Sequence, residues 1–204
     1  LAPSREAENG LLPLLSIAPT LLEAGNSSDY ERFRSDVIAR HGMVTDPLAR
    51  LNLVQVCLLL TADKDLLASL QPHADVLKTL LANKANSNYQ SGFAAMSLAM
   101  MSWRSGDFAG ALEWSSRCRA CPTRNLSRDA TAHALAAMAE QRLGHSDQAR
   151  ADLEKARAIL AGPYDSDAYY PRGKENGHWF NWSIARLLDR EATALMGIND
   201  REAR

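Results

Sequence analysis

Two cysteines inside an arginine-rich stretch have the spacing of redox or metal chemistry. Cys118 and Cys121 are separated by two residues. Such a pair is redox-active in a thioredoxin-like setting, and with a second pair of the same kind it binds zinc. The chain holds three cysteines in all, so no second pair exists. Cys118 falls at a small-residue position of an expected helix, and we interpret it as a packing residue.

The same stretch carries four arginines and no acidic residue. Guanidinium groups bind phosphate and carboxylate groups through paired hydrogen bonds, so the run is a candidate site for a phosphorylated or acidic partner. The alternative is that cations near the C-terminal end of a helix complement its dipole and stay solvated. The candidate anion-binding residues are Arg117, Arg119, Arg124 and Arg128.

The usual signatures of catalysis do not occur in this sequence. Its five histidines, at positions 41, 73, 133, 145 and 178, show no ligand spacing such as His-Glu-x-x-His. There is no Gly-x-Ser-x-Gly elbow and no glycine-rich nucleotide loop. We therefore expect a non-enzymatic protein with no catalytic residue, no metal and no cofactor.

Composition indicates which elements must position these residues. The 204 residues include 33 Ala and 29 Leu but only 5 Val and 5 Ile, the reverse of what strands prefer. The length suits one domain or a short array of repeats. We therefore predict a single, almost entirely helical domain over residues 1–204.

Charge and hydropathy give no general attraction for nucleic acid or membranes. Lys and Arg number 23 against 24 Asp and Glu, a formal charge of −1. The longest apolar stretch, residues 53–62, is too short to cross a bilayer. An odd number of cysteines fits a reducing compartment, so we expect a soluble cytoplasmic protein. Because the chain begins with Leu1 and has no signal-peptide pattern, we expect it to be part of a larger protein.

Two segments of the chain repeat one pattern. In each, a helical stretch ends at a glycine and an alanine follows five residues later, at Gly106 and Ala111 and again at Gly144 and Ala149. The two glycines are 38 residues apart. This is the spacing of a helix-turn-helix unit in which a left-handed glycine ends the first helix.

Weaker versions of the unit precede these two. One surrounds Gly25, although Tyr30 occupies its small-residue position. Another starts with Asp46 as N-cap and Pro47 at the first helical position, and we expect its second helix to run from about Pro72 to about Leu81. We predict repeats over residues 11–42, 46–83, 90–121 and 127–161, a loop over 162–177 and a capping helix over 177–197.

These units resemble the tetratricopeptide repeat (TPR), two antiparallel helices with a small residue at position eight, Gly at fifteen and Ala at twenty. The matching residues are Ala99, Gly106, Phe108, Ala111, Ala137, Gly144, Ala149 and Ala156. The resemblance implies an all-α, right-handed superhelix of about four helix pairs with a C-terminal capping helix.

A narrower resemblance covers about residues 20–196. It is carried by Tyr30-Glu31-Arg32, Asp46-Pro47, Cys57 to Leu60, Trp103 to Gly106, Ala137-Met138-Ala139, Arg142-Leu143-Gly144, Trp182 and Arg190-Glu191-Ala192. Together these are similar to the C-terminal repeat region of serine/threonine protein kinases, and of some β-propeller proteins, in planctomycete-like and verrucomicrobial bacteria. The kinase motifs do not occur in this chain, so the resemblance implies a neighbouring domain and no kinase activity here.

The TPR register places certain residues on a concave face. These are Phe93, Met96, Met100, Trp103 and Arg104 in the third unit, and Thr131, Ala134, Met138, Gln141 and Arg142 in the fourth. An apolar strip with a Trp, adaptable Met side chains and arginines at its edge suits an extended peptide or a helix. The alternative is that a neighbouring helix, such as the last one, covers the strip.

We therefore predict a scaffold that binds a protein or peptide, either of a partner or of its own parent chain, in a concave groove. The alternative function is self-association, as a homodimer or by packing on a kinase or propeller domain without a separate ligand. Neither hypothesis involves nucleic acid or a membrane.

Overall fold

The regular structure that the chain forms is helical. A computed structural model describes residues 11–82, 89–162 and 178–198, and in these ranges it contains no strand, which confirms the all-α class. The predicted loop over 162–177 lies almost wholly outside the described residues. The helices are α2 (Leu14–Glu23), α3 (Ser27–His41), α4 (Pro47–Cys57), α5 (Lys64–Ala82), α6 (Tyr89–Ser105), α7 (Phe108–Arg119), α8 (Leu126–Leu143), α9 (Ser146–Leu160) and α10 (Trp179–Leu195).

Helices α6 and α8 end at left-handed glycines, as the repeat pattern predicted. Gly106 has φ 79° and Gly144 has φ 85°. After each glycine the next backbone N–H reaches back to the helix, from Asp107 to the Ser102 carbonyl and from His145 to the Glu140 carbonyl, both at 2.9 Å. This is the Schellman arrangement, which satisfies carbonyls that the helix itself leaves open.

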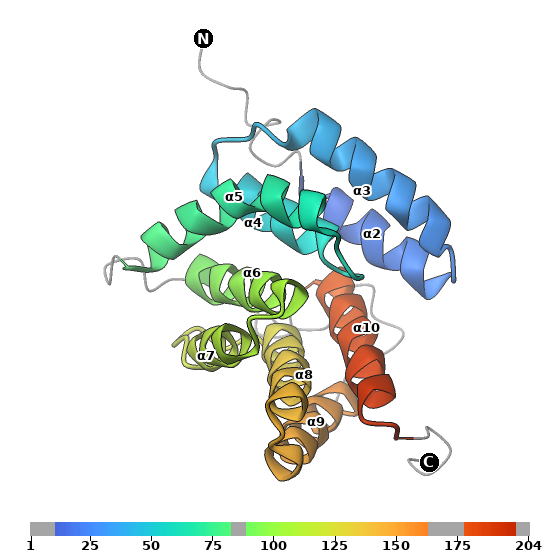
Figure 1. The fold of residues 1–204 in the computed structure, drawn as a ribbon, viewed down its shortest axis with the longest axis vertical. Coiled ribbons are helices and arrows are strands. Elements are labelled where there is room, and N and C mark those ends of the chain that lie inside the picture. The colour runs from blue at the N-terminus through green and yellow to red at the C-terminus, as the bar shows by residue number, and fades with distance from the viewer. Residues whose placement is uncertain (1–10, 83–88, 163–177, 199–204) are drawn as a thin grey trace.

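The four alanines that flank these turns are fully buried. Ala99 and Ala111 belong to the α6/α7 pair, and Ala137 and Ala149 belong to the α8/α9 pair. A side chain of one carbon lets two helix backbones approach closely, which is what an antiparallel pair needs where its helices cross. Helix α7 also packs against α8, so the two pairs form a continuous stack (Figure 1).

The helix pair α4/α5 precedes this stack. Its first helix starts as predicted, but its second helix starts earlier than predicted. The Asp46 carboxylate accepts a hydrogen bond from the Ala49 N–H at 2.7 Å, and Pro47 stands in the first turn of α4. The expected start of the next helix near Pro72 is wrong, because α5 begins at Lys64. The Asp63 carboxylate accepts from the Leu66 N–H at 2.8 Å and so caps that earlier start. Buried residues on both sides of Pro72 hold the helix through it: Leu70, His73, Ala74 and Leu77.

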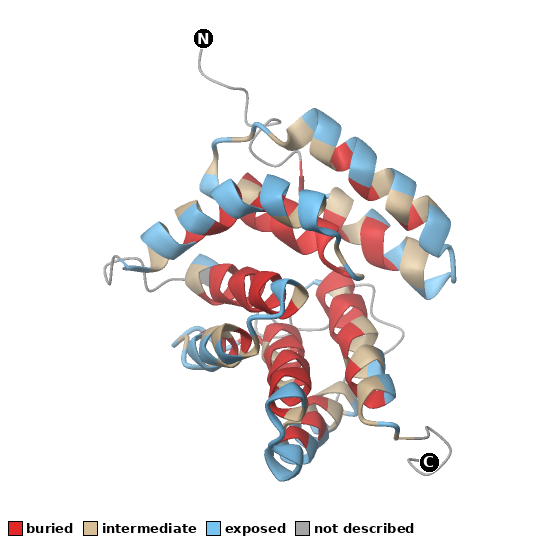
Figure 2. Cartoon of the chain, in the orientation of Figure 1, coloured by how far each residue is buried: buried red, intermediate tan, exposed pale blue. Residues whose placement is uncertain are grey.

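Helix α10 joins the two ends of the array. It packs against α8 and α9 and also against α2, the first described helix (Figure 1). The Glu23 carboxylate of α2 accepts hydrogen bonds from Arg186 at 3.0 Å and from the Ser183 hydroxyl at 3.1 Å, both on α10. Figure 2 shows buried residues gathered along α4, α6, α8 and α10, with exposed residues on the outer helices. Among the described residues, no helix has both the length and the apolar character to cross a membrane.

Candidate functional site

A hollow of about 460 Å³ opens where α6, α8 and α10 end. The link between α4 and α5 closes its fourth side. We call it the rim hollow, and it is lined by Thr61, Ala62, Trp103, Arg104, Gly106, Phe108, Arg142, Glu191 and Leu195. Because α7 begins there at Phe108, partial positive charge from its first N–H groups borders the hollow together with partial negative charge from the carbonyls of the three helix ends.

Aromatic side chains form one wall of the rim hollow. The rings of Trp103 and Phe108 lie 5.4 Å apart between centroids and are tilted by 48°. The turn at Gly106 makes this contact, because it brings the first residue of α7 back beside the last turn of α6. The Trp103 Nε1–H donates to Glu191 Oε1 at 3.0 Å, which fixes the indole against α10. The wall is therefore preformed.

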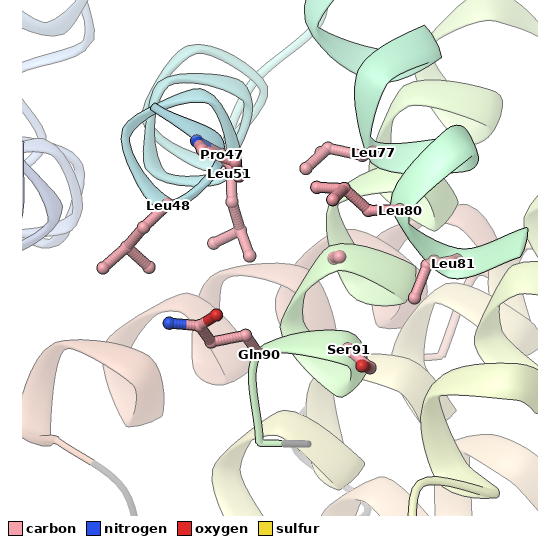
Figure 3. A pocket seen from close by; sticks show the side chains of 9 residues that line it. Pro47, Leu48, Leu51, Leu77, Leu80, Leu81, Gln90 and Ser91 are labelled. Carbon is pink, nitrogen blue, oxygen red and sulfur yellow. The ribbon is translucent and has the colours of Figure 1, made fainter. Parts of the chain in front are cut away.

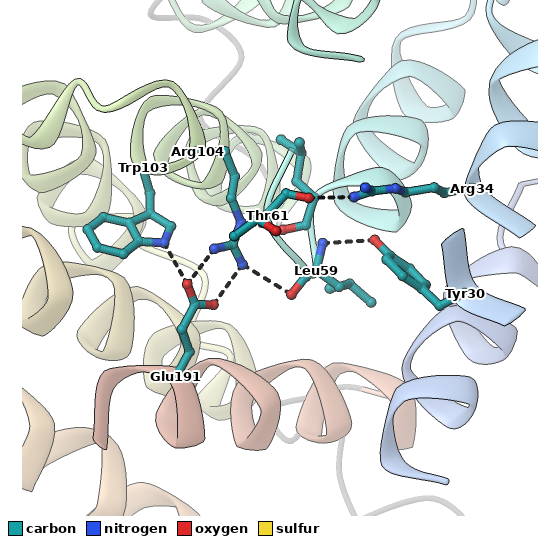
Figure 4. Close-up of polar contacts among 8 residues, drawn as sticks. Tyr30, Arg34, Leu59, Thr61, Trp103, Arg104 and Glu191 are labelled. Carbon is teal, nitrogen blue, oxygen red and sulfur yellow. Dashed lines mark hydrogen bonds and ion pairs between the residues drawn. The ribbon is translucent and has the colours of Figure 1, made fainter. Parts of the chain in front are cut away.

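Arg104 connects three elements at the base of the hollow (Figure 4). Its Nε donates to the Leu58 carbonyl at 2.9 Å, and its Nη2 donates to the Leu59 carbonyl at 3.1 Å. The same guanidinium forms a two-pronged ion pair with Glu191, in which Nη2 lies 2.7 Å from Oε2 and Nη1 donates to Oε1. Only 3% of the Arg104 side chain is exposed. Four of its five N–H groups are thus used inside the chain.

Two side chains of α3 approach the end of α4 from the other side (Figure 4). The Tyr30 hydroxyl donates to the Val56 carbonyl at 2.8 Å and accepts from the Leu59 N–H at 3.1 Å. Arg34 donates from Nη1 to the Thr61 carbonyl at 2.8 Å. Burial raises the pKa of the Tyr30 hydroxyl above its ordinary value, so it stays protonated and keeps donating. Side chains therefore cap the exit of α4 in place of a glycine.

Arg142 is the one cation lining the hollow that has no ion pair within the described part of the chain. It lies in the last turn of α8, is exposed and faces the same hollow as Trp103. The Glu191 side chain is 30% exposed, but Arg104 already neutralises it. The rim hollow therefore offers a bound group an apolar wall and one available positive charge.

The structure separates the residues predicted to form the groove. Trp103, Arg104 and Arg142 line the rim hollow together. Gln141 is half-buried. Trp103 is itself only 9% exposed and also belongs to the core. The remaining residues are buried in the core, and helix α10 packs against α8. Those core residues are Phe93, Met96, Met100, Thr131, Ala134 and Met138.

The four arginines of the candidate anion patch have different surroundings. The Arg117 guanidinium lies 4.4 Å from the centroid of the Trp114 ring, and Arg119 faces Asp152 at 3.9 Å. Arg124 is exposed. The side chain of Arg128 is fully buried and donates to Asp129 at 3.0 Å and to the Thr123 carbonyl at 2.9 Å. Arg128 is therefore a core residue, and an anion in solvent has no access to it.

Two thiols belong to the core. Burial raises the pKa of the Cys118 thiol to about 12, and it does the same for Cys57. Because the thiolate is the reactive form, both side chains act as small apolar groups at neutral pH.

Native Cys57 and Cys118 are expected to resist alkylation. At pH 8 a thiol with a pKa of 12 is ionised on the order of a thousandfold less than an ordinary cysteine, and burial blocks access further. Iodoacetamide labelling followed by peptide mass spectrometry should modify both residues only after unfolding in urea. Rapid labelling of Cys118 in the folded chain would contradict its place in the core.

Sequence reasoning missed Tyr30, Arg34 and Glu191 as partners at this site. Tyr30 gave one signal, since a large residue stood where the repeat pattern expects a small one. Glu191 was singled out only as one of the residues that carry the narrower resemblance, and nothing beside it in the sequence pairs it with Arg104, 87 residues away.

Comparison with known proteins adds no relative to these observations. No protein-family model, curated protein or solved structure matches this chain.

Proposed function

We propose that this chain is a TPR-like scaffold, a right-handed superhelix of helix pairs, that binds a short segment of another protein at the rim hollow. The repeated glycine turns, 38 residues apart, and the buried alanines in each pair support the repeat architecture. A cytoplasmic setting is part of the proposal, supported by thiols that serve as apolar packing residues.

The observation that carries the binding function is the pairing of a preformed aromatic wall with an available arginine. Trp103 and Phe108 hold each other at 5.4 Å, while Arg142 faces the same hollow. Rigid aromatic groups are strong anchors for a partner, because little conformational freedom is lost when they bind. The ligand that fits is an extended segment with one large apolar side chain next to a carboxylate.

The resemblance to repeat regions attached to serine/threonine kinases allows two sources for that segment. We propose that the chain is such an appended region, so the segment can come from the parent protein or from a separate partner. Either source uses the same chemistry at the rim hollow.

Reversal of the charge at Arg142 should abolish this recognition. Random-peptide display against the wild-type chain is expected to enrich peptides with an acidic residue beside an aromatic or aliphatic one. For the selected peptides, Arg142→Glu should weaken binding by about tenfold or more, because attraction becomes repulsion. Fluorescence anisotropy with labelled peptides measures the change.

Arg150→Glu is the matched control, since Arg150 is an exposed arginine on α9 outside the hollow. It should leave peptide affinity within about twofold of the wild type. If the selected peptides lack an acidic residue, or if both variants lose peptide affinity equally, the rim hollow is not the binding site. Arg104 is avoided in this test because we expect its replacement to destabilise the fold.

A further inference from the structure

A second cavity, of about 180 Å³, lies where α2, α4, α6 and the start of α10 meet. It is separate from the rim hollow, since the two share no lining residue. We call it the Gln55 cavity. Its lining residues are Leu12, Leu15, Leu48, Leu51, Asn52, Gln55, Gln90, Phe93, His178, Phe180 and Asn181.

The walls of the Gln55 cavity are mostly apolar. Leu15, Leu51, Phe93 and Phe180 are all buried and belong to the hydrophobic core. Leu48, Leu51 and Gln90 also line an adjoining cavity of about 190 Å³ that extends towards α5 (Figure 3). Apolar cavities of roughly 150 Å³ in protein interiors take up benzene, so this space is large enough for one six-membered ring.

One buried amide in this cavity has a polar atom without a partner. The Gln55 side chain is fully buried, and its Nε2 donates to the Ser97 hydroxyl at 3.1 Å. The Ser97 hydroxyl in turn donates to the Phe93 carbonyl at 2.9 Å. Gln55 Oε1 has no hydrogen-bond partner within the described residues. If the amide oxygen and nitrogen exchanged places, the nitrogen would lack a partner instead of the oxygen, because Ser97 can bond to only one of the two atoms.

An acceptor left unpaired in the interior destabilises a protein unless something donates to it. Asn52, Gln90, His178 and Asn181 also line the cavity, so a water molecule would find polar partners there. Its buried walls, however, are Leu15, Leu51, Phe93 and Phe180, which need an apolar group against them. A ring that carries one donor group satisfies both requirements, since its body matches the walls and its N–H or O–H matches Gln55.

Access to the cavity comes from its outer edge. His178 and Gln90 are exposed, and Leu12 is 37% exposed, so these three residues border the side that faces solvent. Within the described part of the chain, this side of the cavity is therefore open to a small neutral molecule.

We propose that the Gln55 cavity binds a small neutral aromatic molecule with a single hydrogen-bond donor, of the phenol or indole class. The ring lies among Leu15, Leu51, Phe93 and Phe180, and the donor binds Gln55 Oε1. This site is independent of peptide binding at the rim hollow, so either proposal stands or fails alone.

Phenol and toluene are the matched probes, because they share a shape and differ in the donor. Titrations followed by ¹H–¹⁵N NMR should show saturable phenol binding, with shifts at Leu51, Gln55 and Phe93 and weaker binding of toluene. Gln55→Met removes the acceptor while keeping the side-chain length. It should reduce phenol affinity by about tenfold, the value of one buried hydrogen bond, and leave toluene affinity unchanged.

A second pair of variants tests the site even if Gln55→Met fails to fold. Leu12→Trp places an indole at the mouth and should abolish binding of both probes. Leu143→Trp is its control, because Leu143 is exposed to nearly the same extent, 38%, and lies outside the cavity. The proposal is supported if Leu12→Trp abolishes binding of both probes and Leu143→Trp leaves it unchanged. No saturable phenol binding, equal affinities for phenol and toluene, or binding that survives Leu12→Trp would overturn it.

Discussion

Replacing Arg104 with methionine is expected to destabilise the folded chain by about 2–4 kcal/mol, the cost of leaving two buried carbonyls without their donor. The loss is large because the guanidinium serves two carbonyls and a carboxylate at once. Leu58 and Leu59 are buried, and their carbonyls accept hydrogen bonds from this guanidinium. Each unpaired buried carbonyl costs about 1–3 kcal/mol. Urea unfolding followed by circular dichroism measures the change.

Two milder variants separate the parts of this effect. Arg104→Lys keeps the charge, but it lacks the fork that reaches both carbonyls, so we expect an intermediate loss. Glu191→Gln keeps acceptor and donor atoms next to Arg104 and lies partly in solvent, so it should cost about 1 kcal/mol or less. A loss below about 1 kcal/mol for Arg104→Met would show that the α4 terminus needs no such cap.

Gly92→Ala is expected to destabilise the chain by about 2–4 kcal/mol, although alanine is ordinarily better than glycine in a helix by about 1 kcal/mol. A Cβ at this position of α6 would lie 2.2 Å from Nη1 of Arg128 and 2.7 Å from its Cζ. Because the Arg128 guanidinium is fully buried, it must move away from Asp129 and the Thr123 carbonyl. Thermal or urea unfolding should register the loss.

A double-mutant cycle tests the cause of that loss. Arg128→Ala removes the side chain that blocks the new methyl group and is destabilising by itself. In that background, Gly92→Ala should become neutral or stabilising by up to about 1 kcal/mol, which reverses its sign. If Gly92→Ala costs the same in both backgrounds, the contact with Arg128 is not what requires glycine.

Local chemistry could be predicted from the sequence. Gly106 and Gly144 end their helices because a left-handed residue is needed there, and each position carries that information itself. The cap at Asp46 and Pro47 is equally local. Pro72 was misleading because proline favours the first turn of a helix and is also tolerated where packing on both sides is strong.

Properties that depend on distant partners could not be predicted in the same way. A methionine at helical spacing is equally compatible with a groove and with a core. Met96, Met100 and Met138 are buried in the core cluster, and no local pattern in the sequence specifies that outcome. Arg104 looked like a ligand-binding residue because its partners, two backbone carbonyls after the end of α4 and the Glu191 carboxylate, leave no signature beside it in the sequence.

The contact between α10 and α2 also affects how the chain folds. In an open helical array each unit touches only its neighbours, so the ends can unravel while the middle persists. Here Glu23 is held by Ser183 and Arg186, 160 and 163 residues later. Closing such a long loop is slow, and its contacts stabilise the chain only after the helices between them have packed. We therefore expect the chain to unfold as one cooperative unit, in which opening either terminus weakens the other.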